Sequence, residues 1–244
     1  MLSLFKSKPK LAELIPSGYV DIHSHVLPGI DDGAQKIKDA EFLLESMIDF
    51  GFSKVITTPH TMKNVWDNTT ETIKNAHHLV QDELPELSKK VALNCASEYF
   101  LDENLMQLAQ RENLLTLKDN FILIEMSYLN APIQLYDFLF ELQLKGYQLV
   151  LAHPERYNYF HSNKKEFAKL KKAGCLFQLN LLSTTGYYGE SVAKTAQKLL
   201  ENNMIDFVGS DVHHLNHVES FENRIIIKEE SHLIQAIQNN QLFL

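Results

Sequence analysis

The sequence predicts an α/β fold, a parallel (β/α) barrel of about seven strands. Seven short runs of residues are mostly apolar without alternation, which is typical of parallel strands covered on both faces. The runs begin about 30 residues apart, the length of a strand, a helix and their connections. A chain of 244 residues is long enough for one such barrel, and no linker rich in Gly, Pro or Ser divides it.

The elements follow in order along the chain. The predicted strands cover residues 19–23, 54–57, 91–96, 121–125, 148–152, 175–180 and 205–209. Three intervening stretches carry apolar stripes at helical spacing: Ile37, Ala40, Leu44, Met47 and Ile48; Ile133, Tyr136, Leu139 and Phe140; Val192, Ala196, Leu199 and Leu200. Gly51 and Gly146 are expected to end the first two helices. Asn130 with Pro132 is expected to open the second.

Composition and charge limit the class of protein. With 23 Lys and Arg against 31 Asp and Glu, the formal charge is −8, so we expect no nucleic-acid binding through a broad basic face. Residues 1–17 are expected to form an N-terminal arm, and residues 18–244 a single domain. No segment has the apolar length of a signal peptide or a membrane span, so we expect a cytoplasmic protein that is not integral to a membrane. The oligomeric state stays open.

Polar side chains gather where the predicted strands end. His23 and His25 close the first strand, and residues two apart in a strand point to the same face. The other strand ends and the loop after the first strand supply Asp32, His60, Glu98, Glu125, His153, Asp211 and His213. In a barrel, all C-terminal strand ends meet at one mouth. One His-x-His pattern is a weak signal, but six strand ends that all supply such ligands predict a metal centre.

These motifs resemble the polymerase-and-histidinol-phosphatase (PHP) superfamily of metal-dependent phosphoesterases. The wording DIHSHVLPGIDDGA, TPH, SE, IE, LAHPERY and GSDVH is similar to its bacterial protein-tyrosine phosphatase branch, the CpsB/CapC/YwqE type, which regulates capsule and exopolysaccharide synthesis. The motifs run from residue 21 to residue 213, so the resemblance spans most of the chain. It implies a distorted parallel (β/α)7-type barrel, the PHP fold, with three divalent metal ions at its mouth.

The resemblance also implies how the ions are held. The expected ligand sets are His23, His25, Glu98 and Asp211 for one ion; Asp32, His60 and His213 for a second; and Glu98, Glu125 and His153 for a third, with Glu98 bridging. Manganese is the expected metal, and iron or zinc also suit imidazole and carboxylate ligands. Three divalent ions outweigh four carboxylates, so the centre would attract a phosphate dianion.

The resemblance assigns Arg156, in LAHPERY, to the substrate phosphate. Family members often carry a second phosphate-binding arginine a few residues beyond the last histidine, where this sequence has Val218. His217, or Arg224 reaching in from a shifted loop, is the expected substitute. His214 and His217 are also candidate general acids, although phenolate leaves readily without one.

The function that the resemblance implies is that of a metal-dependent protein-tyrosine phosphatase. Its expected partner is a phosphotyrosine-bearing bacterial tyrosine autokinase of polysaccharide export. The expected mechanism is in-line attack of metal-bound hydroxide on the phosphoryl group. A cysteine mechanism needs an arginine six residues after the cysteine. That position holds Leu101 after Cys95 and Leu181 after Cys175, so neither cysteine fits. Three alternatives stay open: a small-molecule phosphatase of the histidinol-phosphatase kind, a nuclease or proofreading module, and a non-catalytic regulatory subunit.

Overall fold

The computed structural model describes residues 7–163 and 165–244, so residues 1–6 of the expected arm lie outside the described residues. The strands in the described part are β1 Tyr19–Asp21, β2 Phe52–Thr57, β3 His60–Thr61, β4 Ala92–Cys95, β5 Glu98–Phe100, β6 Phe121–Glu125, β7 Gln148–Ala152, β8 Leu176–Asn180 and β9 Phe207–Gly209. Each predicted strand is present near its expected position, and β3 and β5 are short additions.

The strands form two sheets, and all strand pairs among the described residues are parallel. One sheet has the order β1-β2-β4, and the other has the order β3-β5-β6-β7-β8-β9. β2 and β3 are successive pieces of one extended segment, which breaks at Pro59, a residue without an N–H for the ladder. The predicted α/β class with parallel strands is therefore confirmed, while the ladder is split into sheets of three and six strands.

Two seams join the sheets. On one side, the chain itself crosses from the first sheet to the second, because β2 is followed directly by β3 and β4 by β5. On the other, the N–H of Asp211 donates to the carbonyl of His23 at 2.7 Å, just beyond β9 and β1. Both seams lie close to residues of the predicted metal centre, including His60, Glu98 and Asp211, so they help to fix the positions of those residues.

Asn240 closes the second seam from the opposite end of the strands. Its buried amide nitrogen donates to the carbonyls of Val20 and Val208 at 2.9 and 2.8 Å, and its Oδ1 accepts the N–H of Val208 at 3.1 Å. Because Val20 lies in the first sheet and Val208 in the second, this one side chain ties the two sheets together.

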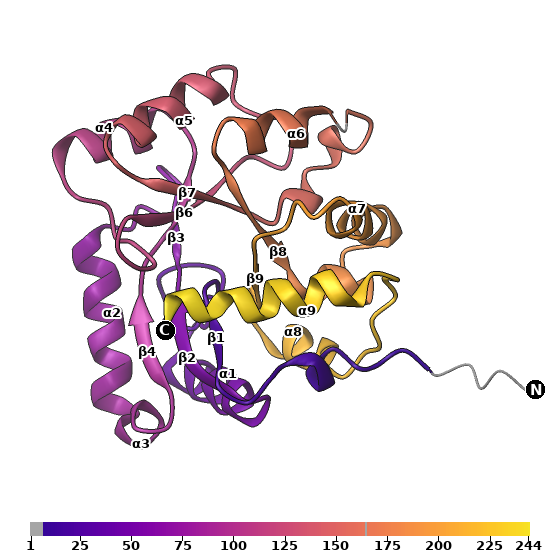
Figure 1. Cartoon of the computed structure of the whole chain (residues 1–244). Coiled ribbons are helices and arrows are strands. Elements are labelled where there is room, and N and C mark those ends of the chain that lie inside the picture. The colour runs from indigo at the N-terminus through magenta and orange to yellow at the C-terminus, as the bar shows by residue number, and fades with distance from the viewer. Residues whose placement is uncertain (1–6, 164) are drawn as a thin grey trace, which may run out of the picture.

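Apolar side chains of both sheets face a shared interior. This inner cluster comprises Val20, Ile22, Ile56, Ala96, Leu117, Leu123, Val150, Ala152, Phe207 and Phe243. Val20 and Ile56 come from the first sheet, and Leu123 and Val150 from the second, so the sheets bury one another's inner faces. The helices cover the outside and bury a larger apolar cluster there (Figure 1).

The α-helices of the described residues are α1 Ile37–Asp49, α2 Thr70–Glu83, α3 Pro85–Ser88, α4 Glu103–Arg111, α5 Leu135–Leu144, α6 Lys165–Lys172, α7 Glu190–Glu201, α8 Leu215–Ser220 and α9 Glu230–Asn239. Short 3-10 helices cover Ala12–Leu14, Pro154–Arg156, Asn158–Phe160, Leu181–Thr185 and Asn240–Phe243. Gly51 and Gly146 follow α1 and α5 with φ of +98° and +92°, as expected for residues that end helices. The stripe of α7 is buried as predicted, and that of α1 largely so.

The face that α5 buries differs from the prediction. The helix begins at Leu135 rather than near Pro132, and its buried residues are Leu135, Phe138, Leu139 and Leu142. Ile133 is 98% exposed and Phe140 is 60% exposed. Since this helix is apolar on several sides, its spacing alone did not distinguish the inward face from the outward one.

The described part of the N-terminal arm packs against the chain after α8. Leu11 is fully buried, and its N–H donates to the carbonyl of Asn223 at 2.9 Å. The N–H of Ala12 donates to the carbonyl of Phe221 at 2.9 Å. Over the residues that the structure describes, no helix combines the length and the apolar character that crossing a bilayer requires.

Two leucines of α5 test its orientation. Leu142 is fully buried, so Leu142→Ala should lower the free energy of unfolding by about 2–5 kcal/mol, because truncation leaves a cavity. Leu144 is 70% exposed, and Leu144→Ala should change that free energy by at most about 0.5 kcal/mol. Urea unfolding followed by circular dichroism measures both, and equal effects would contradict this packing.

Candidate metal centre

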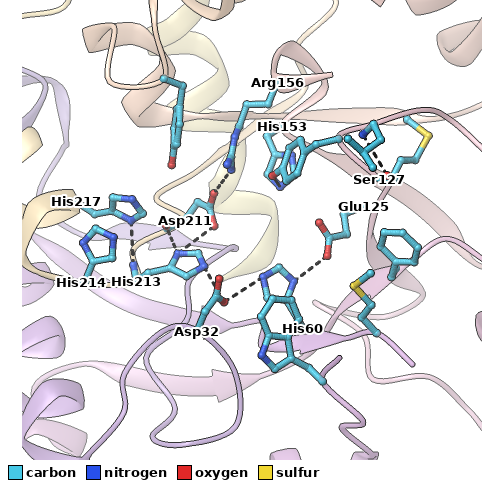
Figure 2. A pocket seen from close by; sticks show the side chains of 17 residues that line it. Asp32, His60, Glu125, Ser127, His153, Arg156, Asp211, His213, His214 and His217 are labelled. Carbon is cyan, nitrogen blue, oxygen red and sulfur yellow. Dashed lines mark hydrogen bonds and ion pairs between the residues drawn. The ribbon is translucent and has the colours of Figure 1, made fainter. Parts of the chain in front are cut away.

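The structure brings all nine predicted ligands together at the C-terminal ends of the strands. Seven are buried: His23, His25, His60, Glu98, Glu125, His153 and Asp211. His213 is partly buried, and the Asp32 side chain is 53% exposed. In four overlapping groups, the donor atoms lie within 4.8 Å of one another. Figure 2 shows Asp32, His60, Glu125, His153, Asp211 and His213 directed toward one pocket.

Glu98 lies at the middle of this cluster. Its Oε2 is 3.1 Å from Nε2 of His23 and 3.2 Å from Nδ1 of His60. Its Oε1 is 3.0 Å from Nε2 of His153. These histidines follow β1, lie in β3 and follow β7, so one carboxylate collects rings from both sheets.

Asp211 forms the second meeting point. Its Oδ1 lies 3.2 Å from Nε2 of His23 and 3.4 Å from Nε2 of His25. Its Oδ2 accepts hydrogen bonds from Arg156 at 2.8 Å and from the amide of Asn180 at 2.7 Å. Asp211 therefore connects the histidine cluster to the arginine at the pocket.

The third part of the cluster is more exposed. Oδ1 of Asp32 lies 3.4 Å from Nε2 of His60 and 3.5 Å from Nε2 of His213. Nδ1 of His60 lies 2.8 Å from Oε1 of Glu125, yet this buried nitrogen has no hydrogen bond of acceptable geometry to any residue that the structure describes. A histidine nitrogen and a carboxylate oxygen that lie this close without hydrogen-bond geometry are suitably placed to bind the same metal ion.

The backbone is unusual at two of these residues. His153 and Asp211 have φ of +36° and +51°, the left-handed region that side chains with a Cβ rarely adopt. Gly33 lets the loop that carries Asp32 pass against His25, because a Cβ at Gly33 would stand 2.1 Å from the carbonyl oxygen of His25. The left-handed backbone at His153 and Asp211 and the close approach of Gly33 to His25 therefore help to position these ligands.

Several supporting side chains were missed by the sequence analysis. Asp31 Oδ2 lies 2.8 Å from Nδ1 of His25, and Gln178 Oε1 lies 2.8 Å from Nδ1 of His23. Such contacts fix which ring nitrogen is free to bind a metal. The available signal was polar residues, Gln178 and Asn180, two apart in the apolar strand β8, and thus on one face.

Carboxylates control the electrostatics of the cluster. Burial by itself would lower the pKa of the His23 imidazole, but the nearby carboxylates of Glu98 and Asp211 outweigh burial and raise this pKa to about 10. Burial and the nearby charge of Glu98 raise the pKa of Glu125. The cluster therefore attracts positive charge, and its imidazole and carboxylate donors are those that zinc, manganese and iron accept. The residues present fit a site for divalent cations.

A pocket of about 440 Å³ opens over the cluster and exposes Arg156. The guanidinium of Arg156 lies between two aromatic rings, 4.8 Å from the centre of Tyr128 and 4.1 Å from that of Tyr188. Its bond to Asp211 holds one end. Aromatic faces and a carboxylate thus fix the plane of a permanently charged fork at the edge of the cluster.

The two candidate substitutes for a second arginine stand in different places. His217 lines the pocket, and its Nδ1 accepts the N–H of His213 at 3.2 Å. Burial lowers the pKa of His217 to about 3, so its ring is neutral near pH 7. Arg224 is outside the pocket, contrary to the expectation that it reaches in, because its guanidinium donates to the carbonyl of Lys8.

Comparison with known proteins identifies the family of this chain. Residues 19–221 match the protein family described as capsular polysaccharide synthesis, CpsB/CapC. The chain belongs to the CpsB/CapC family. The matched range contains all nine clustered residues and Arg156. The resemblance seen in the sequence motifs is thereby confirmed.

Individual relatives agree with the CpsB/CapC assignment. The chain is 30% identical to tyrosine-protein phosphatase YwqE of Bacillus subtilis (strain 168) over 197 residues, covering 80% of this chain and 78% of YwqE. It is 27% identical to tyrosine-protein phosphatase CpsB of Streptococcus pneumoniae over 203 residues, covering 81% of this chain and 84% of CpsB.

Solved structures give the same neighbours. One match is a crystal structure described with YwqE of Bacillus subtilis and CpsB of Streptococcus pneumoniae as unique metal-dependent tyrosine phosphatases. Its sequence is 30% identical to this chain, and the two structures superpose with a TM-score of 0.75. The likeness covers 83% of this chain and 84% of that one. An amidohydrolase from Mycoplasma synoviae, 13% identical with a TM-score of 0.54, shares the fold alone.

Metal binding to the cluster is testable by thermal stability. Mn²⁺ or Zn²⁺ added to metal-free protein should raise the melting temperature, because a ligand at a hundredfold excess over its Kd stabilises the folded state by about 2.7 kcal/mol. His23→Ala should lose most of this shift, and the exposed-site variant Leu144→Ala should keep it. Differential scanning fluorimetry measures the shifts, and an undiminished shift in His23→Ala would place the bound ion elsewhere.

Proposed function

We propose that this CpsB/CapC chain is a metal-dependent protein-tyrosine phosphatase. The observation that carries the proposal is the clustering of nine histidine and carboxylate side chains beneath a pocket that six of them line together with the fixed guanidinium of Arg156. Such a site suits a phosphate ester, because cations and a guanidinium together neutralise its charge. The tyrosine phosphatases YwqE and CpsB, which this chain resembles, support a phosphotyrosine substrate.

We further propose three divalent ions, with manganese first and iron or zinc as alternatives. His23, His25 and Asp211 form one close group, which is the first expected set without Glu98, and His25, Asp32, His60 and His213 form another, which is the second expected set with His25 added. Glu98 belongs to two further groups, with His60 and Glu125 and with His23 and His153, which supports a bridging role. The third expected set is divided between these two groups, because among the described residues no close group holds His153 and Glu125 together.

In this proposal, Arg156 binds and orients the phosphoryl group. One of its N–H groups is held by Asp211, which leaves other donors of the planar fork for phosphate oxygens. Tyr128 and Tyr188 hold the plane of the fork and line the pocket with Trp66, where a tyrosine ring can stack. Ions bound at the cluster would supply Lewis-acid stabilisation of phosphate oxygens and lower the pKa of a water.

Hydrolysis in this site proceeds without a phospho-enzyme in our proposal. No cysteine is among the residues that line the pocket, and burial raises the pKa of the Cys175 thiol to about 12. Hydroxide attacks phosphorus in line with the departing phenolate, whose conjugate acid has a pKa of about 10. The neutral His217 is placed to contact the substrate rather than to supply a positive charge.

The fold has its own proposed refinement. We take the two sheets to act as one distorted barrel in a single domain from residue 18, with residues 7–17 as an arm packed against it. The shared inner cluster and the Asn240 tie between β1 and β9 support this arrangement.

The partner that we propose is a phosphotyrosine-bearing protein, a bacterial tyrosine autokinase of polysaccharide export, with the cytoplasm as the compartment. The family description, capsular polysaccharide synthesis, supports that setting.

Turnover of a phosphotyrosine peptide tests the function. Activity should disappear with EDTA, return with Mn²⁺, Fe²⁺ or Zn²⁺, and survive iodoacetamide, because the site uses no thiolate. Phosphate release is the measurement, with His23→Ala as the inactive control and histidinol phosphate as the competing substrate. Activity lost to iodoacetamide but kept in EDTA would overturn the mechanism, and a strong preference for histidinol phosphate would overturn the substrate.

The two arginines that the sequence offered for phosphate can be separated. Arg156→Ala should lower kcat/KM for the phosphotyrosine peptide by about 10²–10³, the usual cost of one preorganised donor to developing charge. Arg224→Ala should leave kcat/KM unchanged, since its guanidinium contacts the N-terminal segment. Steady-state kinetics on both variants decides, and a larger loss in Arg224→Ala would reverse the assignment.

A further inference from the structure

A second pocket lies directly beside the pocket over the metal centre. Its volume is about 330 Å³, and both pockets are lined by Trp66 and Phe100. Trp66 is held in place by stacking on His60, with ring centres 4.6 Å apart and planes at 15°. The two pockets are therefore neighbours separated by a shared aromatic partition, Trp66 and Phe100.

The second pocket is built from two segments. One side is the chain after β3, including Lys63, Asp67 and Asn68, and the other side is α4, which ends at Arg111. Apolar side chains of α4 form part of the lining. A pocket lined by both apolar and polar side chains, directly beside the metal centre, suits a peptide segment that continues from the phosphotyrosine.

All but one of the charged side chains that line this second pocket have an ion-pair or hydrogen-bond partner among the described residues. Lys63 forms an ion pair with Asp67 at 3.3 Å. Asp102 caps α4, accepting the N–H of Leu105 at 2.9 Å, and also accepts from the amide of Asn104. Arg111 is exposed and has neither an ion pair nor a side-chain hydrogen bond within the described part of the chain. The pocket thus offers one uncommitted positive charge.

We propose that this second pocket binds the peptide segment that flanks the phosphotyrosine and receives an acidic side chain at Arg111. The proposal rests on the proposed phosphatase function and adds a sequence preference to it. The phosphotyrosine would lie over the metal centre, and the neighbouring residues would pass Trp66 and Phe100 into the second pocket. Arg111 can pair with an acidic side chain of that segment, because the other charged side chains that line the pocket already have partners among the described residues.

A charge-swap experiment tests the preference. Peptides that differ only by Glu, Gln or Lys at each flanking position are compared by kcat/KM with the Mn²⁺-loaded enzyme. The unaltered protein should prefer Glu over Gln by about two- to fivefold at the best position, the range of an exposed ion pair, and lose the preference in high salt. Arg111→Gln should abolish the ratio, and Arg111→Glu should favour Lys.

These ratios compare substrates within one enzyme, so they do not depend on the amount of folded protein. Lys169→Gln, an exposed cation on α6 outside both pockets, is the control and should keep the preference. Turnover of p-nitrophenyl phosphate monitors the metal centre in every variant. Equal kcat/KM for all peptides, or a preference that persists in Arg111→Gln, would overturn the proposal.

Direct binding separates failure of this proposal from failure of the proposed function. Trp66 is the single tryptophan of the chain and stands in the partition, so its fluorescence reports occupancy. The probe is a peptide that carries a non-hydrolysable phosphonate analogue of phosphotyrosine, with Glu or Gln at the best flank. A fluorescence change with tighter binding of the Glu peptide, lost in Arg111→Gln, supports the pocket even without turnover. Equal binding of both peptides overturns it.

Discussion

The buried carboxylate of Glu98 is the constraint on which the rest of the site depends. A fully buried charge is strongly destabilising unless partners compensate it. His23, His60 and His153 approach it within 3.2 Å from three strand ends. Those strand ends belong to two different sheets, so the sheets have to meet at this point. The seam contact between Asp211 and His23 is part of the same requirement.

The site also reconciles an acidic protein with an anionic substrate. The whole chain carries a formal charge of −8, but its buried carboxylates are concentrated where cations would bind. Arg156 adds a fixed positive group at the rim, held by Asp211 and by two tyrosine rings. The field that a phosphate meets is therefore set by a few neighbours within the pocket rather than by net charge.

Parallel-strand physics made the ligand set predictable. A continuous apolar run identifies a buried strand, and parallel topology brings successive strand ends to one side. That argument sufficed for residues such as His60, Glu125 and Asp211 because each closes a predicted strand or follows it within about three residues. It did not reach Gln178 or Asp31, whose roles depend on contacts with His23 and His25 made only after folding. Motif spacing carries no information about which ring nitrogen a distant side chain meets.

By itself, the sequence determined the α/β class, the positions of seven strands along the chain, the candidate ligands and the family. These follow from local periodicity and from short motifs, which act over a few residues. Only the tertiary structure decided how the strands divide between two sheets, the outward face of Phe140 on α5 and the turn of Arg224 toward the N-terminal segment. Each of these depends on packing between segments far apart in the chain, where an apolar helix or a long side chain has several acceptable directions and neighbours select one.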